Sequence, residues 1–430
     1  MLSALVAFAA LLALLFLRVP IAFAGAFVGI AGYGLLAGWQ PALALVGQTS
    51  IDTVLTYPLS TLPLFIMMGN FIAKSGMADE LYDVSYAFFG HRPGGLAHAT
   101  VLASGGFSAV CGSSIATAAT MCRVALPSMR RYGYDDKLAM GTIAAGGTLG
   151  ILIPPSVVMV LYGILTNLDI GKLFMAGIIP GVLTIALYMG VIEGVTRFKP
   201  KLAPPGGRTR MRERVLKLRK TGPVIFLFLL VMGGIYFGVF TPTESAGIGA
   251  MGAFLFALWR RALSLSVLTD VLLETGRTTV AMFMLLIGAI LFSNFLNISG
   301  MPLALAEWVR GLNVPPVAVI FAIVLIYLVL GCFLESISMM LLTVPVFFPI
   351  VQALGYDLIW FGVLVVVVIE VGLITPPIGL NIFMLHTMQP DVPMSAIFRG
   401  VAPFLLADAV RVTLFVLFPA IVLFLPKLMG

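Results

Sequence analysis

Two stretches of the chain gather glycine, hydroxyl and carboxylate groups inside apolar sequence. Backbone carbonyls and hydroxyls released from helical hydrogen bonding at membrane depth can bind a hard cation such as sodium. Small residues also cluster wherever membrane helices pack closely, so each residue taken alone has a structural explanation. Together the segments favour ion binding, because each lies beside a predicted helix break. The candidate sodium ligands are Gly112, Ser113, Ser114, Thr117, Gly147, Thr148 and Gly150 in the first stretch, and Glu335, Ser336, Ser338, Gly372 and Thr375 in the second.

The same stretches offer groups that could bind a solute. Helix N-termini that point into a cavity attract anions, because their first N–H groups are unpaired and carry partial positive charge. Ser156 and Asn381 follow the two proline pairs, and helix capping explains these two residues equally well. The candidates for solute binding are Ser114, Thr117, Ser156, Ser338 and Asn381.

Acidic side chains in the apolar segments need a function or a partner, because a charge near the centre of a membrane helix costs at least about 2.5 kcal/mol. Glu335 could bind the cation, carry a proton or pair with a neighbouring helix. Glu370 and Glu244 lie in similar settings, and either could carry a proton. Arg411 lies three residues after Asp408. We expect these two side chains to form a structural pair.

The sequence gives no indication of an enzyme. It contains no GxxxxGK[ST] phosphate-binding loop, so ATP hydrolysis is not expected. No Ser/His/Asp or Cys/His set stands out, and the cysteines lack the spacing of a metal site or a disulfide framework. Any energy that the protein needs would have to come from an ion gradient or another source.

The skeleton of the first stretch recurs 222 residues later, which indicates an internal duplication. Asp135 and Asp357, which are equivalent, are each expected to cap the next helix. Two interrupted segments at matching places in two halves point to a transporter's binding site. Pro127, Gly133-Tyr134-Asp135, Gly150 and Pro154-Pro155 map without gaps onto Pro349, Gly355-Tyr356-Asp357, Gly372 and Pro376-Pro377.

The composition is that of a multi-pass membrane protein. Of 430 residues, 60% are hydrophobic and 10% charged, against roughly 25% charged in soluble domains. The mean hydropathy is +1.11. We therefore expect an all-α membrane protein with about ten spanning helices and two re-entrant helical hairpins. The apolar run 2–17 lacks a basic N-terminal region, so we expect it to be retained as a span and not cleaved as a signal peptide.

The repeat divides the chain into two halves. Residues 1–196 are the first, with a hairpin at about 96–131, tip 109–116, and a helix over 137–165 broken at 146–155. Residues 221–430 are the second, with a hairpin at about 317–352, tip 331–338, and a broken helix over 359–385. We also expect a surface segment over 41–56, a loop containing Asp79 and Glu80, a polar surface stretch over 260–275, and a last span over 401–425.

Basic residues predict the orientation. Ten of the 25 Lys and Arg lie in the linker 197–220, which is typical of a cytoplasmic loop. Marking topology is the simpler interpretation of this cluster, contact with anionic membrane lipid is a second, and nucleic-acid binding is not expected. Counting spans places hairpin 1 open to the cytoplasm and hairpin 2 open to the other side. Charge agrees, because 123–137 holds four basic residues and the matched 345–359 holds none. The halves are thus predicted to be inverted repeats.

The motifs resemble those of the large membrane subunit of tripartite ATP-independent periplasmic (TRAP) transporters. This resemblance covers almost the whole chain. It implies a sodium-coupled importer of organic acids in the bacterial inner membrane, a periplasmic substrate-binding protein, a separate small four-helix membrane subunit and an elevator motion of the domain that carries both hairpins. The motifs are Gly112-Ser113-Ser114 with Ala116-Thr117, Pro127 to Gly133-Tyr134, Gly150, and Leu152-Ile153-Pro154-Pro155-Ser156.

Three alternatives stay open at this point. The first is a stand-alone dicarboxylate or citrate symporter that needs no binding protein. The second is a proton-coupled exchanger that uses Glu335 or Glu370. The third is a membrane scaffold without transport activity, which would not need matched broken helices in both halves.

Overall fold

The computed structural model describes residues 2–312 and 314–429, and over that part of the chain the protein is built from α-helices with two short 3-10 turns and no strand. The helices are α1 Leu2–Phe16, α2 Ile21–Ala37, α3 Trp39–Leu55, η1 Tyr57–Ser60, α4 Thr61–Lys74, α5 Met77–Phe89, α6 Gly95–Cys111, α7 Ser114–Arg131, α8 Asp136–Leu152, α9 Val157–Thr166, α10 Ile170–Phe198, η2 Pro200–Leu202, α11 Met211–Tyr236, α12 Pro242–Trp259, α13 Leu265–Ile298, α14 Met301–Gly311, α15 Pro316–Gly331, α16 Ser336–Ala353, α17 Leu358–Ile374, α18 Leu380–Met388, α19 Met394–Leu417 and α20 Ala420–Leu428.

Helix boundaries follow the sequence repeat. Both α7 and α8 begin and end 222 residues before α16 and α17, respectively. Local chemistry explains these starts: Asp135 accepts a hydrogen bond from the backbone N–H of Lys137, and Asp357 accepts from those of Ile359 and Trp360. The two predicted N-caps are therefore confirmed.

Both hairpins and both broken helices are present. Hairpin 1 (α6 and α7) turns at Gly112 and Ser113, and hairpin 2 (α15 and α16) turns at 332–335, each within its predicted tip. Gly112 has φ +66°, a left-handed conformation that glycine adopts without steric cost. The broken helices are α8 with α9 and α17 with α18, interrupted at the proline pairs. One prediction was too wide, because α8 continues to Leu152 and the first break covers only 153–156.

Two segments predicted to lie outside helices are helical. The expected loop with Asp79 and Glu80 is α5, whose acidic residues occupy the first turn, where they complement the helix dipole. Its residues Met77, Ala78 and Tyr82 are buried. The expected polar stretch before residue 275 is the first part of α13, a continuous helix of 34 residues without proline. In α5 the polar residues mark the exposed side of an amphipathic helix. In the first part of α13 most residues are exposed, and only Val271 and Thr275 are buried.

Two further boundaries differ from prediction. Helix α11 begins at Met211, inside the predicted linker 197–220, so the basic segment is partly helical. The last span is interrupted at Phe418 and Pro419 between α19 and α20, since proline cannot donate the backbone hydrogen bond that continues a helix.

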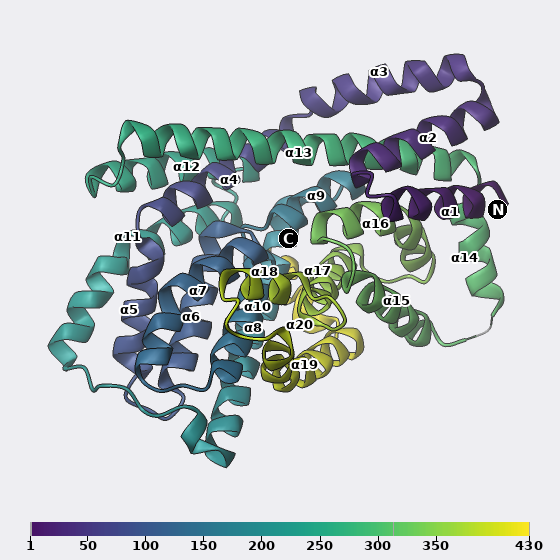
Figure 1. Ribbon diagram of the computed structural model, residues 1–430. Helices are drawn as coiled ribbons and strands as arrows, with labels where there is room; N and C mark the ends of the chain where they lie inside the picture. Colours follow the sequence, from purple (N-terminus) through teal and green to yellow (C-terminus); the bar gives the residue numbers. More distant parts are fainter. Residues whose placement is uncertain (1, 313, 430) are drawn as a thin grey trace.

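The long helix α13 runs along one side of the molecule beside α2 and α4, with α12 next to α4 (Figure 1). The hairpins and broken helices lie below it in Figure 1, together with other helices such as α5, α10 and α19. The centre of this part is formed by α8 and α17, in which residues 138–152 and 360–374 are all buried.

Several helices have the length and composition of membrane spans. Among the described residues, five helical segments qualify individually, including 136–166, and the pair of α3 with η1–α4, bent by 58°, makes a sixth. Other apolar helices, such as α6, α15 and α17, have 10–17 residues and are shorter than the roughly 20 needed to cross alone. The expected number of spanning helices stays a prediction.

Candidate functional site

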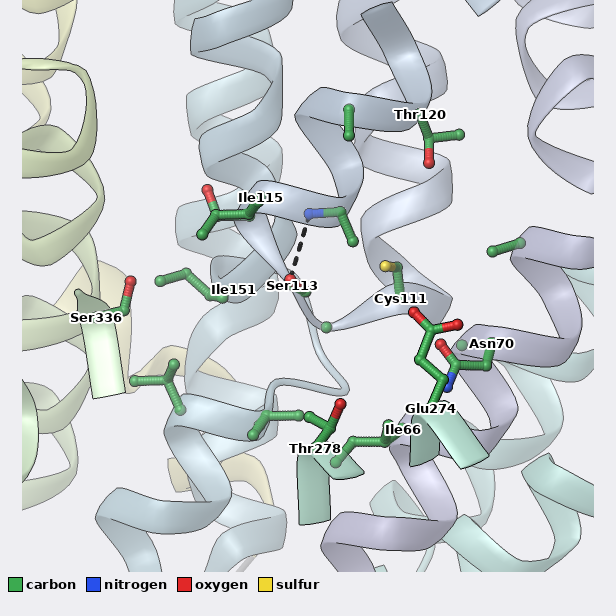
Figure 2. A pocket seen from close by; sticks show the side chains of 18 of the residues that line it. Ile66, Asn70, Cys111, Ser113, Ile115, Thr120, Ile151, Glu274, Thr278 and Ser336 are labelled. Atoms are coloured by element: carbon green, nitrogen blue, oxygen red, sulfur yellow. Dashed lines mark hydrogen bonds between the residues drawn. The ribbon is translucent and has the colours of Figure 1, made fainter. Parts of the chain in front are cut away.

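The two hairpin tips meet in one cavity of about 500 Å³. Hairpin 1 contributes residues from Cys111 to Arg123, and hairpin 2 contributes 335–337. The opposite wall comes from α4 and α13, with Asn70, Lys74 and Glu274. Figure 2 shows Asn70 and Glu274 on helices that face the turn at Ser113. The cavity thus lies between the hairpins and the long helices on the side of the molecule.

The tip of hairpin 1 is tied to the broken helix of the same half. Ser114 Oγ donates a 3.0 Å hydrogen bond to the carbonyl of Gly147. Gly150 permits the close approach, since a Cβ there would lie 2.6 Å from the carbonyl carbon of Ser113. Thr117 Oγ1 donates to the carbonyl of Ser113 at 2.8 Å, and Ser113 caps α7. Oxygens of the first candidate set therefore converge within a few residues of one turn.

Asn381 joins this site from the other half of the chain. Its amide nitrogen donates to Ser114 Oγ at 3.0 Å, and the side chain is fully buried. Its amide oxygen has no hydrogen-bond partner among the described residues. A buried acceptor without a donor is costly unless a ligand satisfies it. Asn381 is therefore a candidate ligand oxygen beside Ser114.

The tip of hairpin 2 repeats the arrangement in part. Gly331 and Gly372 touch backbone to backbone, as a Cβ on Gly372 would lie 2.6 Å from the Cα of Gly331. Glu335 caps α16 by accepting hydrogen bonds from the N–H groups of Ile337 and Ser338. It is thus held by its own helix, and both Glu335 and its neighbour Ser336 line the cavity.

Several predicted residues have side chains that do not line the cavity between the tips. Thr148 Oγ1 bonds the carbonyl of Ala145 and the hydroxyl of Tyr188. Ser156 caps α9 and donates to the carbonyl of Ile151, so of its two predicted roles, solute binding and helix capping, the structure shows the cap. Ser338 lies beside α2 and α13 in a small separate hollow, and Thr375 donates to the carbonyl of Val371 within its own helix.

A cluster of buried charges lies where α17 and α19 meet α10. Arg411 contacts Asp408 at 2.9 Å and Glu370 at 3.9 Å, and it donates to Thr184 at 2.7 Å. Tyr188 donates to Asp408 at 2.9 Å. The expected pairing of Arg411 with Asp408 is therefore observed.

Glu370 and Glu244, which the sequence places in similar settings, differ in the structure. Glu370 is fully buried, and neither of its carboxylate oxygens has a hydrogen-bond donor among the described residues. Glu244 is exposed and forms a capping box with Thr241. This hydrogen bonding to Thr241 lowers the pKa of Glu244, so the side chain stays ionised near neutral pH. Glu244 is thus a cap rather than a proton carrier.

The sequence matches the family "Tripartite ATP-independent periplasmic transporter, DctM component" over residues 8–421. The chain belongs to this family. It is 39% identical over 375 residues to the C4-dicarboxylate TRAP transporter large permease protein DctM of Pseudomonas aeruginosa, with 87% of each chain covered. It is 30% identical over 418 residues to the sialic acid TRAP transporter large permease protein SiaM of Vibrio cholerae, with 97% of each covered.

A longer relative and a solved structure are also similar to this TRAP permease. The isethionate TRAP transporter permease protein DctMQ of Oleidesulfovibrio alaskensis is 32% identical over 347 residues, which cover 79% of this chain and 53% of that protein. The solved YdaH transporter of Alcanivorax borkumensis has a TM-score of 0.62 at 17% identity, with 89% of each chain covered. At that identity the likeness concerns the fold alone. The family consists of transporter permeases, so the chain is not an enzyme.

Sequence reasoning missed most of the cavity wall opposite the tips. Asn70, Lys74 and Glu274 come from helices outside the two interrupted stretches. Arg123, one turn before Pro127 in a hairpin arm, was counted only for its charge. A basic residue inside an otherwise apolar hairpin was the signal that could have identified it.

Proposed function

We propose that this TRAP permease imports an organic acid anion across the bacterial inner membrane, driven by a sodium gradient. The observation that carries the proposal is the cavity between the two hairpin tips. Its wall holds the basic side chains Lys74 and Arg123, which suit a carboxylate or sulfonate. It also holds the acidic side chains Glu274 and Glu335 and the turn at Ser113 and Ser114, which suit a sodium ion. C4-dicarboxylate, sialic acid and isethionate, the solutes in the relatives' names, are all organic acids of this kind.

We place one sodium site at each hairpin tip, because side-chain and backbone oxygens lie close together there. In the first, Ser114 and Asn381 lie next to the backbone at Gly150, and the free amide oxygen of Asn381 would complete the set. In the second, Ser336 and the backbone where Gly331 meets Gly372 provide the corresponding oxygens. A sodium ion at either place would draw each tip onto the adjoining helix break.

Contacts between the halves support an inverted arrangement. Arg130, at the base of hairpin 1, pairs with Asp391, just after the second broken helix, at 2.7 Å. Tyr162, near the end of the first broken helix, donates to the carbonyl of Leu358, at the start of the second, at 2.7 Å. Each contact joins two segments that the inverted topology places on the same side of the membrane.

The proposed transport step is an elevator movement of the hairpin-bearing domain against α4, α12 and α13. Gly69 of α4 contacts the arm of hairpin 1, where a Cβ would lie 3.2 Å from the Cα of Cys111. Because glycine places no side chain in this contact, one backbone could slide past the other. A separate four-helix membrane subunit would extend the static part, and a periplasmic binding protein would deliver the substrate.

Reconstitution tests the proposal. The chain is placed in proteoliposomes with its small subunit, and uptake of labelled succinate, sialic acid or isethionate is measured with the cognate binding protein present. We expect uptake of one acid only with an inward sodium gradient. Undiminished uptake in potassium buffer contradicts sodium coupling, and uptake driven by a pH gradient alone favours the proton-coupled exchanger.

The same assay separates the stand-alone symporter from the TRAP mechanism. Omission of the binding protein is expected to abolish uptake. Full uptake by this polypeptide alone would instead identify a symporter that needs no partner.

A further inference from the structure

The first ten residues of α11, 211–220, are rich in Lys and Arg. One side of this segment packs against α5, and the other side is exposed. Helix α11 has 26 residues, about 39 Å at 1.5 Å per residue, whereas the hydrocarbon core of a membrane is about 30 Å thick. Its apolar part, residues 221–236, is about 24 Å long, and the ten residues 211–220 add about 15 Å at the membrane surface. Its apolar end runs to Tyr236, so the basic end is the part that projects.

Two basic residues of this segment have partners on α5. Arg214 lies over the ring of Phe88 at 5.7 Å, and Lys217 lies 3.7 Å from Asp83. These contacts attach one side of the helix to the protein. They also determine which side of the helix remains free.

The free side combines arginines with exposed apolar residues. Met211, Val215 and Leu218 are 68%, 49% and 43% exposed, and at 100° per residue they form one stripe. Arg212 and Arg219 lie next to this stripe on the helix, and no described carboxylate forms an ion pair with either.

The arginines border a shallow hollow of about 760 Å³. It is lined by Arg210, Arg212, Glu213, Val215, Leu216 and Arg219. Three guanidinium groups and two apolar side chains face the hollow, against one carboxylate. Arginine binds phosphate oxygens through parallel N–H donors, while apolar residues at headgroup depth contact acyl chains.

We propose that this face of α11 binds the headgroup of an anionic phospholipid in the cytoplasmic leaflet, with Arg212 and Arg219 on the phosphate and the stripe of Met211, Val215 and Leu218 against the acyl chains. This goes beyond marking topology, since topology needs only the number of basic residues. A lipid site needs these two arginines in particular.

Thermal unfolding of the full-length protein in an uncharged detergent tests the proposal. We expect added phosphatidylglycerol to raise the unfolding midpoint saturably, and phosphatidylcholine or inorganic phosphate to have no such effect. Each basic residue near an anionic surface contributes to the free energy of lipid binding. We therefore expect the loss of two such residues to raise the half-saturating lipid concentration roughly 30-fold. The test variant is therefore Arg212→Gln with Arg219→Gln.

The matched control is Lys199→Gln with Lys201→Gln, which removes equal charge from exposed positions of the same linker. It is expected to keep the parent's half-saturating concentration, and Arg212→Lys with Arg219→Lys should recover part of the response. Equal weakening in both glutamine pairs, an equal shift with phosphatidylcholine, or no shift at all would overturn the proposal. A shift reproduced by inorganic phosphate would do so as well, because it would identify a site for free anions.

Discussion

Gly150 is the position at which the proposed sodium site is most open to a steric test. An alanine there would place its Cβ 2.6 Å from the carbonyl carbon of Ser113 and 2.8 Å from the Cα of Ser114. All of these atoms belong to backbone, so no side chain can rotate away. The tip of hairpin 1 has to move instead.

The size of this movement follows from the contact. The distance of 2.6 Å is 0.8 Å short of 3.4 Å, where ordinary van der Waals contact begins. A displacement of that size would lengthen the 3.0 Å hydrogen bond from Ser114 to Gly147 beyond the hydrogen-bonding range. Overpacking of this kind costs about 1–3 kcal/mol, which corresponds to roughly 5- to 150-fold in an equilibrium constant.

The assay is sodium-dependent uptake in proteoliposomes, with the half-saturating sodium concentration as the readout. For Gly150→Ala we expect this concentration to rise at least about fivefold. The control is Gly190→Ala, because a Cβ at Gly190 meets no described atom within 4 Å. The control should transport normally and is expected to gain up to about 1 kcal/mol of helix stability.

A folded Gly150→Ala protein with the parent's sodium dependence would refute the assignment of sodium to hairpin 1. Circular dichroism and the unfolding midpoint establish that the variant is folded. A variant that fails to fold leaves Gly372→Ala, the equivalent position in the second half, as the corresponding test of hairpin 2.

Three further outcomes are expected. Ser114→Ala loses one donor and one acceptor of the tip, and we expect about tenfold weaker sodium activation with unchanged expression. Arg411→Leu leaves two buried carboxylates without a counter-ion and should lower the free energy of unfolding by about 3–5 kcal/mol. Glu370→Gln leaves the pair of Arg411 and Asp408 electrically neutral and should be tolerated. Equal unfolding midpoints for the two variants would contradict this. Gly69→Leu places a large side chain against hairpin 1 and should block transport while expression is unchanged, as measured by uptake in proteoliposomes.

The helix interruptions and caps could be predicted from local sequence. Glycine and proline act on their own backbone, so the turn at Gly112 and the breaks at the two proline pairs did not depend on distant residues. The same holds for Asp135 and Asp357, whose side chains bond to N–H groups two or three residues on. The repeat located the second copy of each feature.

Polar residues led to two wrong predictions of secondary structure. The acidic residues of α5 and the polar first part of α13 were interpreted as loop or surface stretch, although both segments are helical. The buried side of these helices depends on what packs against them.

The tertiary structure decided which groups form the site. Asn381 reaches Ser114 across 267 residues, and Arg411 reaches Thr184 across 227. Asn70 and Glu274 face the tips only because α4 and α13 pack beside the hairpins. Local periodicity specifies where a helix starts, stops and turns its apolar side, but the rotation and height at which two helices meet depend on the fit of side chains from both. For that reason the sequence by itself determined the interrupted segments, and packing determined which oxygens and charges they share.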